Sequence, residues 1–321
     1  VDGGLGNDTI FGDDLVEGPD DGDDQIQGGG GNDTIFAGGG NDLVAGGAGN
    51  DTIYGGSGDD RIRGDGGADV IDGGSGNDVI GGGAGKDNLA GGDGNDQMAG
   101  DGGNDTMSGG SGNDVMLGGA GDDSMDGGTG NDLMDGADGA DTMNGGDGND
   151  RINASDGNDT VNGGAGNDTI NGGSGNDKLS GGAGNDIFLF IQTEVDGASD
   201  HDVITDWDSG DVIYLWGQPE FTPVKIQYIN ADFVPGPGND ETNDVFIQFN
   251  NGQKLTILNA KADFAEALDF TPNFVDNTVP VGANADDFVH VGFAPDCIID
   301  CTVPPVPSVP VPFDFWATIT R

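Results

Sequence analysis

A nine-residue pattern repeats without interruption over residues 28–189 and limits the folds open to this chain. The stretch opens GGGGNDTIF, AGGGNDLVA, GGAGNDTIY and holds 18 units over 162 residues. Two further units, 3–11 and the degenerate 19–27, precede it across an interruption at 12–18, which makes 20 units in all. A short fixed period with glycines in register is typical of a solenoid, in which each repeat stacks on the next.

Two positions of the unit keep one chemical character throughout. The eighth residue is apolar in all 20 units and is methionine in six consecutive ones. The sixth residue is aspartate in all 20 units: Asp8, Asp24, Asp33, Asp42, Asp51, Asp60, Asp69, Asp78, Asp87, Asp96, Asp105, Asp114, Asp123, Asp132, Asp141, Asp150, Asp159, Asp168, Asp177 and Asp186. The alternative is a glycine- and aspartate-rich disordered linker, but random low complexity does not hold a ninefold phase.

The spacing predicts an all-β fold, a parallel β-roll of about 20 nonapeptides. Three residues of each unit, such as Thr52, Ile53 and Tyr54, suit a short strand whose middle side chain points inward. The other six residues turn the chain, and glycines at the first, second and fourth positions permit positive φ. Two units then make one coil, so that residues 18 apart stack and the 20 units give about 10 coils. One apolar residue in nine gives a thin core, so we expect a further source of stability.

The unit reads G-G-x-G-x-D-x-U-x, and it resembles the RTX (repeats-in-toxin) calcium-binding family, whose nonapeptides form a parallel β-roll. The resemblance covers residues 3–189. It implies one Ca²⁺ between the loops 28–33 and 46–51, bound by the carboxylates of Asp33 and Asp51 and by backbone carbonyls. Ca²⁺ takes six to eight oxygen ligands, whereas Mg²⁺ demands tight octahedral geometry and keeps its waters.

The carbonyl ligands that the resemblance implies follow the same register in neighbouring loops. They are those of Gly29, Gly31, Gly46 and Ala48 around the first ion, and of Gly47, Gly49, Gly55, Gly56, Ser57, Gly58, Gly73, Gly74, Ser75 and Gly76 around the next ones. An uninterrupted roll of 20 units offers up to about 18 such sites. We expect the interruption at 12–18 to cost one or two sites near Asp8 and Asp24.

The net charge excludes some classes of partner. Asp and Glu number 59 against 9 Lys and Arg, which gives a formal charge of −50. Such a chain is not expected to bind nucleic acid or to adsorb to an anionic membrane. No apolar run approaches 18 residues, so no membrane span is predicted. Calcium ions at about 18 sites would offset roughly 36 of these negative charges, and we expect the metal-free chain to be largely disordered.

The composition changes after Leu189, and we expect domains at 1–189, 190–270 and 271–321. Residues 190–270 are predicted to cap the roll, with strands at 202–207, 211–216, 224–229, 245–249 and 254–258. Asn251-Gly252 suits a hairpin turn, and 262–268 a short helix. The run DHDVITDWDSGDVIYLWG resembles the segment after the repeats in type I secreted proteins such as serralysin-type proteases. Asp200-His201-Asp202 within it is interpreted as a polar turn before a strand, with a metal or catalytic cluster as the alternative.

Residues 271–321 are interpreted as a Pro-rich tail, for which a secretion or docking role is the hypothesis. VPPVPSVPVP at 303–312 favours polyproline II, and type I secretion signals are C-terminal. Cys297 and Cys301 suit an intrachain disulfide outside the cell, although pairing between chains and free thiols remain open.

Two functions fit these features. The first is a non-enzymatic, calcium-binding structural or interaction protein at the surface of a Gram-negative bacterium or outside it, such as a surface-layer, matrix, filament or adhesin component. Its other partners would be copies of itself or extracellular proteins, bound through the cap and tail. The second is the calcium-dependent export and folding module of a secreted hydrolase, such as a metalloprotease or epimerase. The chain has two histidines and neither an H-E-x-x-H nor a G-x-S-x-G motif, so no catalytic residue is predicted.

Overall fold

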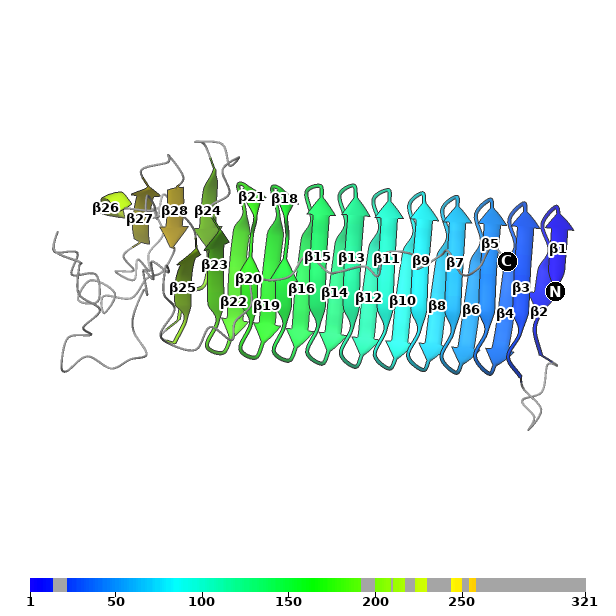
Figure 1. Cartoon of the computed structure of the whole chain (residues 1–321). Coiled ribbons are helices and arrows are strands. Elements are labelled where there is room, and N and C mark those ends of the chain that lie inside the picture. The colour runs from blue at the N-terminus through cyan, green and yellow to red at the C-terminus, as the bar shows by residue number, and fades with distance from the viewer. Residues whose placement is uncertain are drawn as a thin grey trace, which may run out of the picture.

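A computed structural model describes residues 1–13, 22–191, 200–208, 210–216, 223–229, 244–249 and 254–257. All regular elements in these ranges are β-strands, arranged in two sheets of 14 strands each (Figure 1). No helix in the described part of the chain is long and apolar enough to cross a membrane. The fold is thus the predicted all-β solenoid.

The strands mostly alternate between the two sheets along the chain. The first sheet contains β1 (Asp2–Leu5), β3 (Gln25–Gly30), β5 (Leu43–Ala48), β7 (Arg61–Gly66), β9 (Val79–Ala84), β11 (Gln97–Gly102), β13 (Val115–Ala120), β15 (Leu133–Asp138), β17 (Arg151–Asn153), β18 (Asp156–Gly157), β20 (Thr169–Asn171), β21 (Ser174–Gly175), β23 (Ile187–Ile191) and β25 (Val212–Trp216). The second contains β2 (Thr9–Phe11), β4 (Thr34–Gly39), β6 (Thr52–Ser57), β8 (Val70–Ser75), β10 (Asn88–Asp93), β12 (Thr106–Ser111), β14 (Ser124–Thr129), β16 (Thr142–Asp147), β19 (Thr160–Ala165), β22 (Lys178–Ala183), β24 (His201–Ile204), β26 (Pro223–Ile229), β27 (Asp244–Phe249) and β28 (Lys254–Ile257). The exceptions to the alternation are β17 with β18 and β20 with β21, which are consecutive strands of the first sheet, and β26, β27 and β28, which all belong to the second.

The predicted 18-residue register is confirmed. Parallel neighbours pair Leu89 with Met107 in the second sheet and Met98 with Met116 in the first. The roll makes about nine turns, one fewer than the expected 10, and its first turn is interrupted at residues 14–21, which lie outside the described ranges. Outward side chains stack in the same register: the rings of Phe36 and Tyr54 lie 5.0 Å apart between centroids.

The strands are longer than the three residues predicted. A regular strand such as β6 runs six residues, from the seventh position of one unit to the third of the next, and buries both Ile53 and Gly55. The first-position glycine therefore points inward, and its φ lies outside the positive range that the second- and fourth-position glycines adopt. Only glycine fits at this position without a steric clash, because a Cβ on Gly55 would lie 2.6 Å from Asp60 Oδ2.

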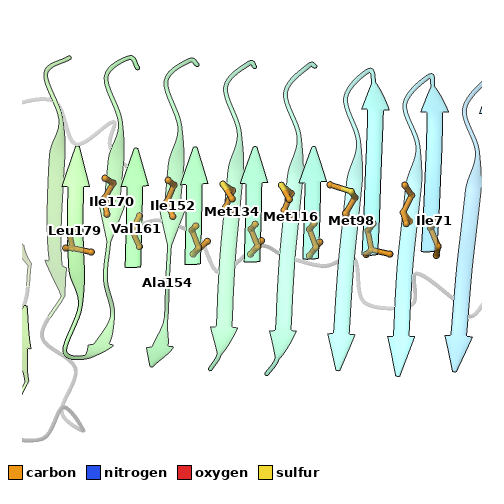
Figure 2. Close-up of a cluster of buried hydrophobic side chains, with 14 of the residues drawn as sticks. Ile71, Met98, Met116, Met134, Ile152, Ala154, Val161, Ile170 and Leu179 are labelled. Carbon is orange, nitrogen blue, oxygen red and sulfur yellow. The ribbon is translucent and has the colours of Figure 1, made fainter. Parts of the chain in front are cut away.

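The core is a double column of single apolar side chains (Figure 2). Each unit contributes its eighth residue, and the methionines at six of these positions are at most 3% exposed. Figure 2 shows Met98, Met116 and Met134 in line with Ile152 and Ile170 along one sheet. Because methionine is flexible, it fills irregular space between facing strands.

The second unit differs from the predicted arrangement. A Cβ on Gly12 would lie 2.7 Å from Asp24 Oδ2 and 2.3 Å from Ala37 O, the same two kinds of contact that first-position glycines of regular units would make. Gly12 therefore begins the second unit, and the added residues follow it within the loop that ends at Asp24. The prediction of an interruption at 12–18 before a degenerate unit at 19–27 was wrong in its bounds, because the degenerate unit has no glycine pair to mark its start.

The roll continues beyond the nonapeptides. Strand β24 pairs parallel with β22, β25 pairs parallel with β23, and β26, β27 and β28 add an antiparallel meander. The five strands predicted here are confirmed within a few residues, and β27 and β28 pair antiparallel, whereas the predicted turn at Asn251-Gly252 lies outside the described residues. Ile204, Trp207, Ile213, Leu255 and Ile257 belong to the same buried cluster as the repeats. The predicted helix at 262–268, the tail 271–321, Cys297 and Cys301 lie outside the described residues.

Candidate metal centres

The sixth-position aspartates form two ladders along the roll, one at each edge. In both ladders the backbone N–H of each aspartate donates to the Oδ1 atom of the aspartate in the next coil. Asp33 N donates to Asp51 Oδ1 at 2.8 Å in one ladder, and Asp96 N donates to Asp114 Oδ1 at 2.8 Å in the other. The fixed nine-residue period therefore turns a sequence repeat into a continuous row of carboxylates.

The second oxygen of these carboxylates has no hydrogen-bond partner. Oδ2 is buried and unpartnered in 19 of the 20 predicted aspartates, Asp24 being the exception. The sixth-position aspartates from Asp33 to Asp186 are at most 2% exposed. A buried carboxylate oxygen without a donor is costly, and a cation supplies the missing partner.

Backbone carbonyls converge on the same gaps between coils. A Cβ on Gly47 would lie 2.2 Å from Gly29 O, and one on Gly49 would lie 2.0 Å from Gly31 O, so both carbonyls face the next loop. The Gly46 carbonyl points the opposite way, toward the preceding coil, and would lie 2.5 Å from a Cβ placed on Gly28. The structure thus brings these three predicted carbonyl ligands together between loops 28–33 and 46–51.

The remaining predicted carbonyls repeat this arrangement. Those of Gly49, Gly56, Gly58, Gly74 and Gly76 approach the fourth- or second-position glycine one coil later, and that of Gly73 faces back to Gly55. The third-position carbonyls of Ala48, Ser57 and Ser75 also face back and accept backbone N–H groups of the preceding coil. The Gly47 carbonyl lies 4.0 Å from a Cβ on Gly66 in the next coil, and Gly55 is buried within β6. The ligand set itself remains a prediction.

The donor set is one of oxygens. Among the described residues, no three His, Cys, Asp or Glu side chains gather into a metal-binding group. The oxygens in each gap are instead one carboxylate from each of the two coils together with main-chain carbonyls. A hard cation that accepts many oxygens in flexible geometry fits this set, and Ca²⁺ is that cation. The residues therefore fit calcium, with Mg²⁺ disfavoured by its need for a tight octahedron.

Burial raises the pKa of many ladder aspartates. It brings the pKa of Asp60, Asp159 and Asp168 to about 7 from an ordinary value of 3.8. It brings the pKa to about 6 for Asp69, Asp78, Asp96, Asp105, Asp123 and Asp132. The N–H donated to Oδ1 lowers the pKa in each case and the neighbouring carboxylates raise it, so desolvation dominates. In the metal-free roll Asp60, Asp159 and Asp168 are therefore partly protonated at neutral pH, and the other six gain their protons in mild acid.

We expect the calcium requirement for folding to fall in acid. The metal-free roll binds more protons than the unfolded chain, so protonation stabilises it at low pH, and this stabilisation is lost as the pH rises through 6 to 7. Protons then neutralise part of the ladders in place of calcium, so the calcium midpoint of folding should decrease as the pH falls below this range. Calcium titrations followed by circular dichroism over a pH series measure the shift. A midpoint that stays constant through pH 6 to 7 contradicts the assignment.

Sequence reasoning missed two members of the ladders. Asp177 N donates to Asp202 Oδ1 and Asp186 N donates to Asp211 Oδ1, each at 3.1 Å. Both steps span 25 residues, the spacing that also links Asp8 to Asp33. The available signal was D-V-I, which occurs at Asp202 and again nine residues later at Asp211. The interpretation of Asp200-His201-Asp202 as a polar turn before a strand was wrong for two of its residues, because β24 begins at His201 and contains Asp202.

The fold and these loops define a class: a parallel β-solenoid with candidate cation sites between its stacked loops. The family model described as RTX calcium-binding nonapeptide repeat (4 copies) matches residues 1–14, 20–53, 45–80, 81–116, 117–152 and 153–188. The chain belongs to this family; its repeats bind calcium, and proteins with such repeats are typically secreted. No curated protein matches the chain.

Replacing Asp105 by Asn should weaken two calcium sites, because its carboxylate stands between Asp87 and Asp123 in one ladder. The amide oxygen still accepts the N–H of Asp87, so the change isolates the loss of charge. We expect calcium binding, measured by equilibrium dialysis, to fall by about two ions at a concentration that just saturates the native chain. Asp126→Asn, an exposed aspartate on an outer strand face, is the matched control and should leave the number unchanged. Equal binding by Asp105→Asn and the native chain contradicts the site arrangement.

Proposed function

We propose that this chain is a non-enzymatic structural or interaction protein that acts outside a Gram-negative cell and folds on calcium binding after type I secretion. One observation carries the proposal: 19 buried carboxylates keep an oxygen without a partner, in a molecule of formal charge −50. Such a row is repulsive until cations enter it. Folding is therefore conditional on a supply of calcium.

The calcium requirement suits export. At the low free calcium of the cytosol the acidic chain stays unfolded and can be threaded through a secretion channel. Outside the cell, calcium fills the gaps between coils and folding follows, which disfavours return. Binding free energy is then folding free energy, as in other proteins whose metal sites do not exist before folding.

The shape supports a structural role. About nine turns at roughly 4.8 Å per strand give a rod of about 45 Å. Its outer face near the N-terminal end carries the stacked rings of Phe11, Phe36 and Tyr54, each about 40% exposed. We assign contacts with other copies or with extracellular proteins to the segments after residue 189, where the large aromatic side chains otherwise gather.

The N-terminus and the location of the native protein distinguish this role from that of an export module of a secreted hydrolase. Mass spectrometry of the protein isolated from its source culture gives the native N-terminus, and fractionation before and after a chelator wash gives its location. We expect a protein at the cell surface or in the medium, with no enzyme domain upstream of Val1. A protease, lipase or epimerase domain joined upstream of the repeats overturns the structural role and leaves calcium binding intact.

A further inference from the structure

We propose that the last gap of the roll, between loop 181–186 and loop 206–211, is a calcium site outside the nonapeptide repeats. The inference rests on calcium binding by the repeats and extends it to a loop without the repeat motif. Loop 206–211 has an aspartate, Asp206, in place of the first-position glycine and a tryptophan, Trp207, in place of the second. Calcium sites are otherwise expected only where both loops of a gap follow the motif.

The gap keeps the carboxylate arrangement of the regular sites. Asp186 is 1% exposed, and its Oδ2 atom is buried without a partner. Its backbone N–H donates to Asp211 Oδ1 at 3.1 Å, the same link that joins regular coils. Asp211 is itself 2% exposed. Two buried aspartates thus face each other across this gap as they do throughout the ladder.

The two ends of the ladders show which gap an unpartnered Oδ2 serves. Asp8, the first member of its ladder, has an unpartnered Oδ2 and only a following coil. Asp211 is the last member of the other ladder, and its Oδ2 accepts the N–H of Asp208 at 2.7 Å. Each Oδ2 therefore serves the gap that follows it, which places Asp186 Oδ2 in the gap before loop 206–211.

Further negative charge surrounds this gap. The Asp206 carboxylate accepts the N–H groups of Gly181 at 3.0 Å and Gly182 at 2.8 Å, and so closes the hydrogen-bonding edge of the last repeat. Burial, then repulsion from Asp206 and Asp208, raises the pKa of Asp186. A divalent cation offsets this concentration of carboxylates. Asp186 and Asp211 would hold it from either side, with the carbonyls of Gly182 and Gly184 from the repeat loop.

The loop also contains a spectroscopic reporter. Trp207 lies between Asp206 and Asp208 in sequence, is 9% exposed and packs against Phe188 with ring centroids 6.3 Å apart. Terbium replaces calcium at oxygen-rich sites and emits when an adjacent tryptophan absorbs. A terbium ion in this gap should therefore be sensitised by Trp207.

The test measures terbium emission from the full chain, excited at the red edge of tryptophan absorption, where tyrosine does not absorb. The native chain should give strong emission that calcium displaces. Asp211→Asn should lower the emission severalfold, close to the level of Trp207→Phe, because it removes a ligand from this gap alone. Asp126→Asn, an exposed aspartate on an outer strand face in the middle of the roll, is the matched control and should keep the emission.

Each outcome decides the proposal. Emission from Asp211→Asn equal to that of the native chain overturns the terminal site while the repeat sites stand. Emission and circular dichroism that respond to no metal at all overturn calcium-dependent folding as well. If Asp211→Asn does not reach the native spectrum in saturating calcium, Asp211→Glu is used. Glu keeps the charge but displaces the oxygen, so a shifted calcium midpoint for terbium displacement supports the site and an unchanged midpoint overturns it.

Discussion

Chelation of calcium should unfold the roll. Without the ion, the buried Oδ2 atoms of the ladders face one another's charge and no donor, while one apolar side chain per unit gives a thin core. We expect far-ultraviolet circular dichroism to lose its β-sheet signal and the radius of gyration to grow toward about 60 Å, the scaling value for an unfolded chain of this length. Small-angle scattering and circular dichroism on the same sample measure both changes.

Calcium added back should restore the compact state, and magnesium at the same concentration should not, because it keeps its waters and demands a tight octahedron. Magnesium is therefore the control for general screening of charge. A β-sheet spectrum that is unchanged by chelator at neutral pH contradicts the metal-dependent fold.

Alanine at Gly103 should have the second largest effect. Gly103 has φ +143°, a conformation that L side chains rarely adopt, and a Cβ there would lie 1.3 Å from Gly85 O in the preceding coil. The backbone strain alone costs about 1–3 kcal/mol, and the contact forces two coils apart at a carbonyl that faces a calcium gap. We expect the calcium midpoint of folding to rise at least about tenfold.

The adjacent residue supplies the control. Gly102 has no atom within 4 Å of its Cβ position and no positive φ, so Gly102→Ala should change stability by at most about 0.5 kcal/mol. The two variants are equal in composition and differ only in the space and φ of the site. Equal calcium midpoints for Gly102→Ala and Gly103→Ala would show that the coils are not stacked as described.

The period of the sequence was sufficient to predict the fold. Residues 18 apart stack because two units close one coil, and the burial of Ile53 and the exposure of Tyr54 follow from strand alternation. Strand length was not predictable in this way, because it depends on glycines such as Gly55, which pack inward without carrying a hydrophobic signal. Their role is steric: the space that a Cβ would fill is occupied by an aspartate oxygen.

The candidate sites were predictable wherever both loops follow the motif. Asp202 and Asp211 were not found, because seven extra residues break the nine-residue phase before Asp202 and the flanking glycines are gone. The same kind of break concealed the start of the second unit at Gly12. In both places, hydrogen bonding between coils restores a register that the one-dimensional pattern no longer shows.

The aspartate ladders make the roll a chain of nearest-neighbour couplings. Because each Asp Oδ1 is held by the amide of the preceding coil, a folded coil is the template for the next, and stability is a sum of local interface terms. Folding can then nucleate at one coil and propagate coil by coil in both directions. Damage to one coil would divide the rod into two shorter folded segments that remain joined by a loose link.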